Sequence, residues 1–407
     1  MYLCAKKTIL NKQMPSYIIF RPVRPIHYIL YIGTLFLLTS CGGNRSEGLS
    51  EVGDTLLFRH ARNLTLVTYP DRTEVTMRNP WDTTTTLARY CFRHRKEQTP
   101  SNSPSMGRKP FPTEGEGLGR ESGSLPLKKA GIFSSVHLAL LHELGADSAV
   151  GGICDLEFCN LSHFKKAVAE GRIANLGNSI QPSLEQIIDL NPDALLPSPF
   201  ENSGGLGRVE KLGIPIIWCA DYMENTPLAR AEWIRFYGRL FGRAEEADSI
   251  FRCVESRYQE LCAIASTVKT RPRLLPEMPW SGQWTLPGSG SSSTRLYADA
   301  GAEYLFADLE GNGGIPLSTE KVVDKAVDAD IWLIKHHGPL SRRQMNADTP
   351  LLAAIKAPIW WCDTSTTLLY EETPFHPERL LENLIAIIHP ELNIQPQYKY
   401  FEKLNSL

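Results

Sequence analysis

Residues 183–196 read SLEQIIDLNPDALL, and a similar pattern returns at residues 318–334 as STEKVVDKAVDADIWLI. Each stretch begins with a serine suited to a helix N-cap, continues as a short amphipathic helix with a glutamate in its first turn, and ends in an apolar strand. Two copies of one helix-to-strand unit, far apart in the chain, predict two similar lobes. Glu185 and Glu320 then occupy equivalent places on these lobes.

Strand-like and helix-like segments alternate on both sides of these copies. Residues 129–225 and 269–390 each alternate in this way, which is typical of a mostly parallel sheet covered by helices. Between them, a helical pattern runs from Thr226, a good N-cap, to about Thr267, with Gly242 as its weak point. We therefore predict an α/β protein of two lobes, each a mostly parallel sheet flanked by helices, joined by a single long backbone helix.

The first residues of the chain read as an address signal. A basic segment precedes an apolar run from Ile26 to Leu38, which is too short to span ~30 Å of hydrocarbon and fits the core of a signal peptide. The run ends in Leu38-Thr39-Ser40-Cys41, which resembles the bacterial lipoprotein box, where the cysteine carries the lipid. We expect Cys41 to be lipidated, with Met14 as an alternative start, and the protein to be anchored in the bacterial cell envelope facing the periplasm.

Composition limits the partners of the chain. Its 407 residues carry a formal net charge of −2, with 22% charged and 42% hydrophobic residues, so a nucleic-acid partner is not indicated. No stretch after the signal is long and apolar enough to cross a membrane. Among the later cysteines, Cys154 and Cys159 are the most plausible local pair, whereas Cys219 and Cys362 read as buried thiols.

The remaining segments complete the predicted organisation. Strand-like residues 64–69 and 74–78 read as a hairpin, and residues 92–127 lack an apolar period and read as a loop or disordered insert. The predicted parts are a signal peptide (1–40), a tether (41–53), an N-terminal β-hairpin extension with a flexible insert (54–128), an N-terminal lobe (129–225), an interlobe helix (226–268), a C-terminal lobe (269–390) and a polar tail (391–407).

Ligands of open α/β sheets bind in loops beyond the carboxyl ends of the strands. Those loops are rich in polar groups and aromatic rings here, and the rings would wall a flat ligand. We interpret His336 as a hydrogen-bonding loop residue in preference to a metal ligand. Three tryptophans are interpreted as core residues: Trp218, Trp332 and Trp361. The residues expected at the ligand are Phe133, Ser134, Ser135, Asp155, Phe200, Trp280, Gln283, Trp284, His336 and Tyr370.

Five segments, taken in order, resemble the class III periplasmic substrate-binding proteins. They are SLEQIIDLNPDALL, LGIPIIWCADY, TPLARAEWIRFYGRLFG, QWTLPGSGSSSTRLYADAGA and LSTEKVVDKAVDADIWLI. The resemblance covers roughly residues 129–388, and the 54–128 region departs from it. It implies a receptor that captures a ferric siderophore, haem or cobalamin and delivers it to an ABC permease dimer with its cytoplasmic ATPase. It also implies a monomer without intrinsic cofactor, bound metal or catalytic residues, in which Glu185 and Glu320 pair with permease arginines.

Two other functions stay open on the sequence alone. A receptor for a free ion such as zinc or manganese would need three or four ligands from both lobes, and the available side chains lack convincing spacing. Those side chains are His137, Asp155, His336 and Glu372. A lipoprotein enzyme, or a surface scavenger without a permease, is the third reading. GxxxxGK[ST], GxSxG and HExxH motifs are absent, so we expect a binding protein and not an enzyme.

Overall fold

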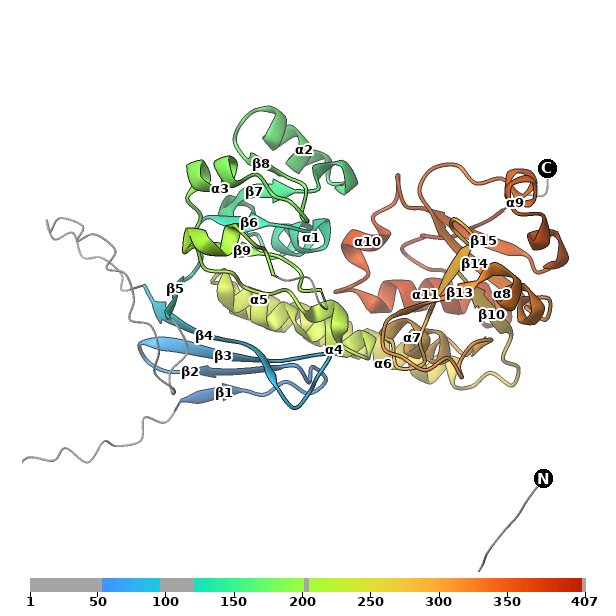
Figure 1. Ribbon diagram of the computed structural model, residues 1–407. Coiled ribbons are helices and arrows are strands. Elements are labelled where there is room, and N and C mark those ends of the chain that lie inside the picture. Colours follow the sequence, from blue (N-terminus) through green and yellow to red (C-terminus); the bar gives the residue numbers. More distant parts are fainter. Residues whose placement is uncertain (1–52, 96–120, 201–204, 405–407) are drawn as a thin grey trace, which may run out of the picture. The chain divides into compact units, whose positions relative to one another are not determined.

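The computed structural model describes residues 53–95, 121–200 and 205–404, which form an N-terminal sheet followed by two α/β lobes (Figure 1). Cys41, the predicted signal peptide and most of the tether lie outside the described residues. Among the helices of the described ranges, none has the length and apolar character needed to cross a membrane.

The segment before the lobes is a five-stranded sheet. Its strands are β1 (Asp54–Leu56), β2 (Leu64–Thr68), β3 (Arg72–Arg78), β4 (Thr86–His94) and β5 (Glu121–Leu125), in that order, with β5 parallel to β4 and the other pairs antiparallel. The predicted hairpin is confirmed as β2 and β3, whose alternation buries Leu66 and Met77. The prediction of a loop over residues 92–127 is wrong at both ends of this range, because its first residues belong to β4 and residues 121–125 form β5. The polar sequence of β5 has no apolar alternation, so its strand depends on backbone pairing with β4.

The N-terminal lobe is a four-stranded parallel sheet in the order β8-β7-β6-β9. It contains β6 (Ala130–Ile132), β7 (Val150–Cys154), β8 (Ala174–Gly177), β9 (Ala194–Leu196), α1 (Ser135–Glu143), α2 (Ser162–Ala169) and α3 (Leu184–Leu190). Beside β9, Leu195 and Ile216 form an isolated parallel bridge. Cys154 and Cys159 carry separate buried thiols, so the predicted pair is wrong.

The predicted interlobe helix is divided into three helices: α4 (Pro227–Glu232), α5 (Ile234–Leu240) and α6 (Ala244–Ala265). Gly242 has a φ of +69°, a left-handed conformation that lets the chain turn after α5, and α6 then packs against α5. A Cβ at Gly238 would lie 2.3 Å from the Cβ of Ala247, so only glycine permits this close packing. An uninterrupted helix over 226–267 is therefore wrong. The 22 residues of α6, about 33 Å long, provide the long connector.

The C-terminal lobe contains a five-stranded sheet in the order β12-β10-β14-β15-β16, in which only β16 is antiparallel, and a ribbon of β11 and β13. The predicted polar tail is wrong at its end, because it supplies β16. Tyr400 and Phe401 are buried there, and their N–H groups donate to the amide oxygen of Asn383. The elements of this lobe are β10 (Arg273–Pro276), β11 (Gln283–Pro287), α7 (Ser292–Asp299), β12 (Glu303–Tyr304), β13 (Gly314–Ser318), α8 (Thr319–Ala326), β14 (Ile331–His336), α9 (Arg342–Asp348), β15 (Ile359–Asp363), α10 (Leu369–Glu372), α11 (Pro377–Ile388) and β16 (Glu402–Lys403).

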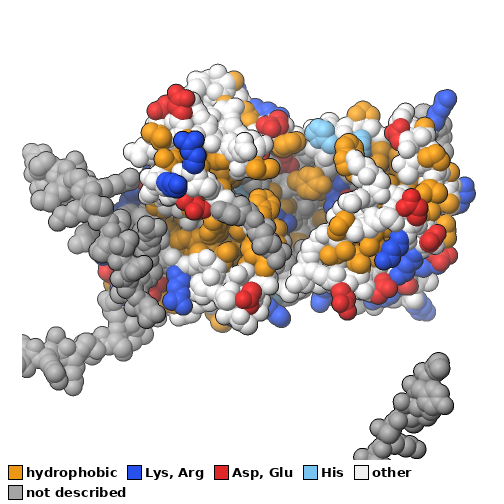
Figure 2. Space-filling view, viewed as in Figure 1, with side chains coloured by type: hydrophobic (Ala, Val, Ile, Leu, Met, Phe, Trp, Pro, Cys, Tyr) orange, Lys and Arg blue, Asp and Glu red, His pale blue; other side chains and the backbone are white. Residues whose placement is uncertain are grey.

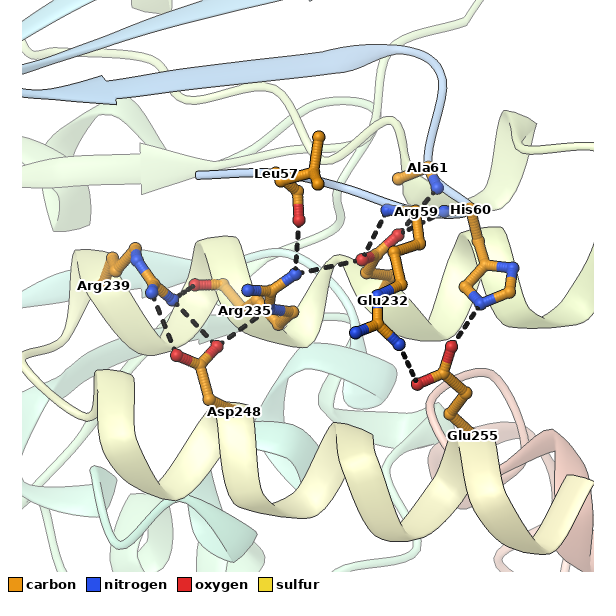
Figure 3. Close-up of polar contacts among 9 residues, drawn as sticks. All are labelled: Leu57, Arg59, His60, Ala61, Glu232, Arg235, Arg239, Asp248 and Glu255. Carbon is orange, nitrogen blue, oxygen red and sulfur yellow. Dashed lines mark hydrogen bonds and ion pairs between the residues drawn. The ribbon is translucent and has the colours of Figure 1, made fainter. Parts of the chain in front are cut away.

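The turn between β1 and β2 is attached to α4 through a buried carboxylate (Figure 3). Glu232 has no exposed surface, and its two oxygens accept hydrogen bonds from the backbone N–H groups of Arg59, His60 and Ala61 at 2.7–2.9 Å. Arg235 also donates to Glu232, at 3.1 Å. Because the acceptors are matched to backbone donors, this contact fixes the path of the chain whatever side chains the turn carries.

Candidate ligand cleft

Equivalent strand ends in the two lobes both place an acidic residue in a left-handed conformation. Asp155 follows β7 with a φ of +53°, and Glu277 follows β10 with a φ of +64°. Such conformations cost free energy for residues other than glycine and persist where the surroundings fix them. The N–H of Glu277 donates to the carbonyl of Leu333, and its carbonyl accepts the indole N–H of Trp332 at 2.7 Å. The N–H of Asp155 likewise donates to the carbonyl of Gly177, so hydrogen bonds fix the backbone at both strand ends.

A cavity of about 590 Å³ lies between the lobes, within the size range of small-molecule sites. Tyr222 and Arg230 line it from the N-terminal side, and Trp280, Lys335 and Tyr370 line it from the C-terminal lobe. Figure 2 shows this region as a hollow between the lobes with hydrophobic side chains on its walls. Ser292 and Ser293, in the first turn of α7, and Gln283 add polar groups to the same wall.

The N-terminal loops form a second cavity, of about 290 Å³. It brings together four of the predicted residues, Phe133, Ser134, Asp155 and Phe200. Ser134 is also the N-cap of α1, where its hydroxyl accepts from the N–H of Val136, and Ser135 is the first residue of that helix. The ring of Phe200, with 60% of its surface exposed, lies 6.5 Å from that of Tyr222, so the two cavities adjoin through these rings.

Arg230 reaches the cavity from a buried polar network. Its Nε donates to Asp221 at 3.1 Å, and the same carboxylate lies 3.0 Å from Nε2 of His137 and 2.8 Å from the hydroxyl of Tyr237. Burial raises the pKa of Asp221, but His137 and Arg230 outweigh it and hold that pKa below its usual range. Burial likewise opposes protonation of His137, yet Cys219 and Asp221 raise its pKa. The network fixes the guanidinium and retains positive charge beside the cavity.

Lys335 is the second cation at the cavity. Its Nζ lies 2.5 Å from the carboxylate of Glu277 and 5.9 Å from the centre of the Tyr370 ring. Burial lowers the pKa of Lys335, but the facing Glu277 outweighs burial and raises it, so the amine stays charged at neutral pH. One bond to Glu277 leaves Lys335 further donors for an acidic group of a ligand.

The two tryptophans of the 278–284 loop have different environments. Trp280 is 80% exposed and lines the interlobe cavity, whereas Trp284 is fully buried. The indole N–H of Trp284 donates to the carbonyl of Pro276 at 3.2 Å, and its ring packs 5.6 Å from that of Trp332. The expectation that Trp284 faces the ligand is therefore wrong. Its place in β11 accounts for this, since alternate residues of a strand point to opposite faces.

The other predicted residues divide between two sides of Trp280. Gln283 and Tyr370, the latter 48% exposed, line the interlobe cavity. His336 lines a neighbouring cavity on the far side of Trp280, where its Nδ1 lies 3.0 Å from the carbonyl oxygen of Gly338. His336 is thus a hydrogen-bonded loop residue, and it does not line the interlobe cavity.

Several cleft residues were not among those predicted from the sequence, chiefly Arg230, Lys335, Tyr222 and Trp218. Lys335 and His336 are adjacent at the end of β14, and strand alternation sends them to different cavities, so the register of the strand was the missing information. Trp218, expected in the core, is half-buried and lines the N-terminal cavity. The side chains suggested for a free metal ion do not gather, because His137 belongs to the Asp221 network and Glu372 accepts from Tyr400.

Glu185 and Glu320 occupy the same position in two capped helices. Each is the second residue of its helix, α3 or α8, and is exposed. Ser183 and Ser318 precede these helices as N-caps, and each hydroxyl accepts from the backbone N–H three residues later, at 3.3 Å. A first-turn carboxylate is stabilised by the helix dipole, which accounts for both placements without any partner.

The lobes also contact each other directly beside the cleft. The side-chain amide of Asn160 donates to the carbonyls of Thr364 and Thr367, both at 2.9 Å. His376 lies 2.7 Å from Glu143 of α1 and 2.9 Å from Glu378. These contacts fix one side of the cleft, next to α10.

Two α/β lobes with a cavity between their strand ends define the class of two-lobed solute-binding proteins. Residues 139–358 match the periplasmic binding protein family, and the chain belongs to this family, in its class III branch. Members of the family work with an ABC permease and its ATPase.

Among solved structures, the chain is similar to a periplasmic haem-binding protein of Pseudomonas aeruginosa. The two share 18% identity with a TM-score of 0.53, over 69% of this chain and 99% of that one. It is also similar to the molybdate-binding protein MolA of Haemophilus influenzae, with 15% identity and a TM-score of 0.52, over 65% and 87% of the two chains. An uncharacterized lipoprotein of Methanocaldococcus jannaschii is 23% identical over 378 residues, which cover 88% of this chain and 87% of that protein. At these identities the solved structures establish the fold and leave the cargo open.

Proposed function

We propose that this protein is the lipid-anchored substrate-binding component of an ABC importer and that it carries a metal chelate with acidic groups, such as haem or a ferric siderophore. The observation that carries the proposal is the interlobe cavity, where the rings of Trp280 and Tyr370 accompany the cations Arg230 and Lys335. Flat rings suit a macrocycle or a catecholate, and the cations suit its carboxylates or other negative groups. A cobalamin would make less use of the two cations as partners for acidic groups, so we favour the acidic chelates as cargo.

The two matched glutamates support the delivery step. Glu185 and Glu320 project from equivalent helix starts in the two lobes, away from the residues that line the cavities. Two acids in the same place on two lobes suit a permease built from two copies of one subunit. Ion pairs at such an interface act mainly on the encounter rate and the register, and they weaken with salt.

A fluorescence titration tests the choice of cargo. The purified protein is titrated with haemin, cyanocobalamin and ferric siderophores that do or do not carry carboxylates, with correction for inner-filter absorption. We expect saturable quenching by an acidic chelate, weakened in Trp280→Leu and unchanged in Trp81→Phe, whose tryptophan precedes β4 in the N-terminal sheet. Absence of binding by every chelate to the folded protein would refute the proposal and favour a free-ion receptor or an enzyme.

A further inference from the structure

Three side chains of metal-binding type converge on the N-terminal lobe, away from the residues that line the cleft. His142, Asp147 and His163 each offer one ligand atom, and these atoms all lie within 4.8 Å of one another. His142 belongs to the last turn of α1, Asp147 begins a short 3₁₀-helix (Asp147–Ala149), and His163 belongs to the first turn of α2. Three separate backbone elements therefore position the group.

The three candidate ligand atoms lie near the separations that a bound metal ion requires. Nδ1 of His142 lies 2.8 Å from Oδ2 of Asp147, and the imidazole rings of His142 and His163 have their centres 4.3 Å apart with a tilt of 37°. In a tetrahedral site with metal–ligand bonds of about 2.0–2.2 Å, the ligand atoms lie roughly 3.3–3.6 Å apart. The three ligand atoms, which lie within 4.8 Å of one another, would have to move closer by side-chain rotation to hold an ion.

One oxygen of Asp147 contacts His142, and the Asp147 side chain as a whole is 44% exposed. Its second oxygen, Oδ1, is shielded from solvent and has no hydrogen-bond partner in the described structure. A buried carboxylate oxygen without a partner costs free energy, and most such atoms in proteins are paired with a donor, a water molecule or an ion. The contact between His142 and Asp147 accounts for Oδ2 and leaves Oδ1 available to a ligand.

Phe164 gives the group an apolar support. Its buried ring lies 4.2 Å from the ring of His163 and 6.5 Å from that of His142. Apolar packing behind imidazole ligands fixes their orientation and limits access of water to a metal site. The opposite side of the group is open, because His142 and His163 are exposed.

We propose that His142, Asp147 and His163 form a binding site for a divalent transition-metal ion, separate from the cargo cleft. Two imidazoles and one carboxylate suit Zn²⁺, Ni²⁺ or Cu²⁺ better than Mg²⁺ or Ca²⁺, which prefer oxygen ligands. Three protein ligands leave a coordination position for water. The bound ion links α1, α2 and the 3₁₀-helix between them, next to Glu143, which contacts the other lobe through His376. Zn²⁺, Ni²⁺ or Cu²⁺ found in the purified protein is then assigned to this site and not to a chelate in the cleft.

Zn²⁺ titration of the whole protein against a chromophoric chelator tests the proposal, with Mg²⁺ as the comparison ion. We expect one Zn²⁺ per chain, and a loss of affinity of about tenfold or more in His142→Gln and in His163→Gln. His337→Gln removes an exposed histidine of the other lobe and serves as the control, and Trp280→Ala tests independence from the cleft. Both are expected to keep wild-type affinity for Zn²⁺.

A second measurement guards against variants that misfold. Co²⁺ bound to the wild-type protein should show visible d–d absorption of a site with inner-sphere imidazoles, and Zn²⁺ should displace it. The proposal is overturned if the wild type binds no Zn²⁺ or shows no such absorption with Co²⁺. It is equally overturned if folded His142→Gln and His163→Gln variants bind Zn²⁺ as the wild type does, or if the Trp280 variant loses the ion. Loss of Zn²⁺ binding in the His142 and His163 variants says nothing about a chelate in the cleft, whereas its loss in Trp280→Ala would place the ion in the cleft.

Discussion

Replacement of Glu232 by alanine tests how the N-terminal sheet is held to the lobes. The carboxylate is fully buried and accepts three backbone N–H groups from the turn between β1 and β2 (Figure 3). Alanine leaves these donors without an acceptor and also leaves Arg235 without this partner. Glutamine keeps the shape of the side chain and one acceptor oxygen.

The size of the effect follows from these contacts. A buried donor that loses its acceptor costs about 1–3 kcal/mol, and loss of one partner of a buried ion pair costs about 3–5 kcal/mol. Since Arg59 and His60 are only partly buried, we expect Glu232→Ala to lower the free energy of unfolding by about 4 kcal/mol. Glu232→Gln should lower it by about 2 kcal/mol, because one acceptor remains.

Glu255 provides a matched control at the same turn. Its carboxylate contacts only side chains there, Arg59 at 3.3 Å and His60 at 2.8 Å. An ion pair near the surface contributes about 0–1 kcal/mol, so Glu255→Gln should change stability by less than 1 kcal/mol. Urea unfolding followed by tryptophan fluorescence and circular dichroism measures all three variants. A Glu232→Ala midpoint equal to that of Glu255→Gln would refute the idea that backbone capture by Glu232 holds the sheet in place.

Three further predictions concern the cleft, the permease and pH. Trp280→Ala should weaken chelate binding roughly tenfold and leave stability unchanged. Trp284→Ala should lower the free energy of unfolding in urea by about 3–5 kcal/mol. Equal effects of the two variants on affinity and on stability would contradict an exposed Trp280 and a buried Trp284. Combined Glu185→Ala and Glu320→Ala should abolish uptake by cells at unchanged chelate affinity, and lost affinity would argue against a docking role. Burial lowers the pKa of His376, but its two glutamate partners outweigh burial and raise it from 6.5 to about 9. The resulting stabilisation, about 3 kcal/mol, is complete below pH 6.5 and disappears as the pH rises through 9. Between pH 6.5 and 9, the urea midpoint should therefore fall more in the wild type than in His376→Gln. Parallel curves of midpoint against pH would exclude a stabilising contact of His376 with its two glutamate partners.

Two features of the fold have a local signal in the sequence. Residues 283–286 read Gln-Trp-Thr-Leu, and this alternation of polar and apolar residues identifies a strand with Trp284 on its buried face. The glycine and proline content of the surrounding loop concealed it. Likewise, Gly242 was visible as a weak point, and its left-handed backbone is where the chain turns between α5 and α6.

Other features depend on partners far away in the chain. The strand character of β5 and β16 comes from hydrogen bonds to β4 and β15, because neither short segment has a strong pattern of its own. Arg230 and Lys335 meet at one cavity only because α4 and the end of β14 are brought together across the cleft. Nothing in the residues next to either cation indicates the other.

The sequence by itself determined the features that arise within a few residues. Helix caps, first-turn acids and the alternation of strands and helices are local consequences of hydrogen bonding and side-chain periodicity, so two lobes and the placement of Glu185 and Glu320 were predictable. The tertiary structure alone decided which tryptophan faces the cleft, which cations line it, and how His142 and His163 approach each other. These depend on long-range packing and register, which a single sequence specifies only through the complete fold.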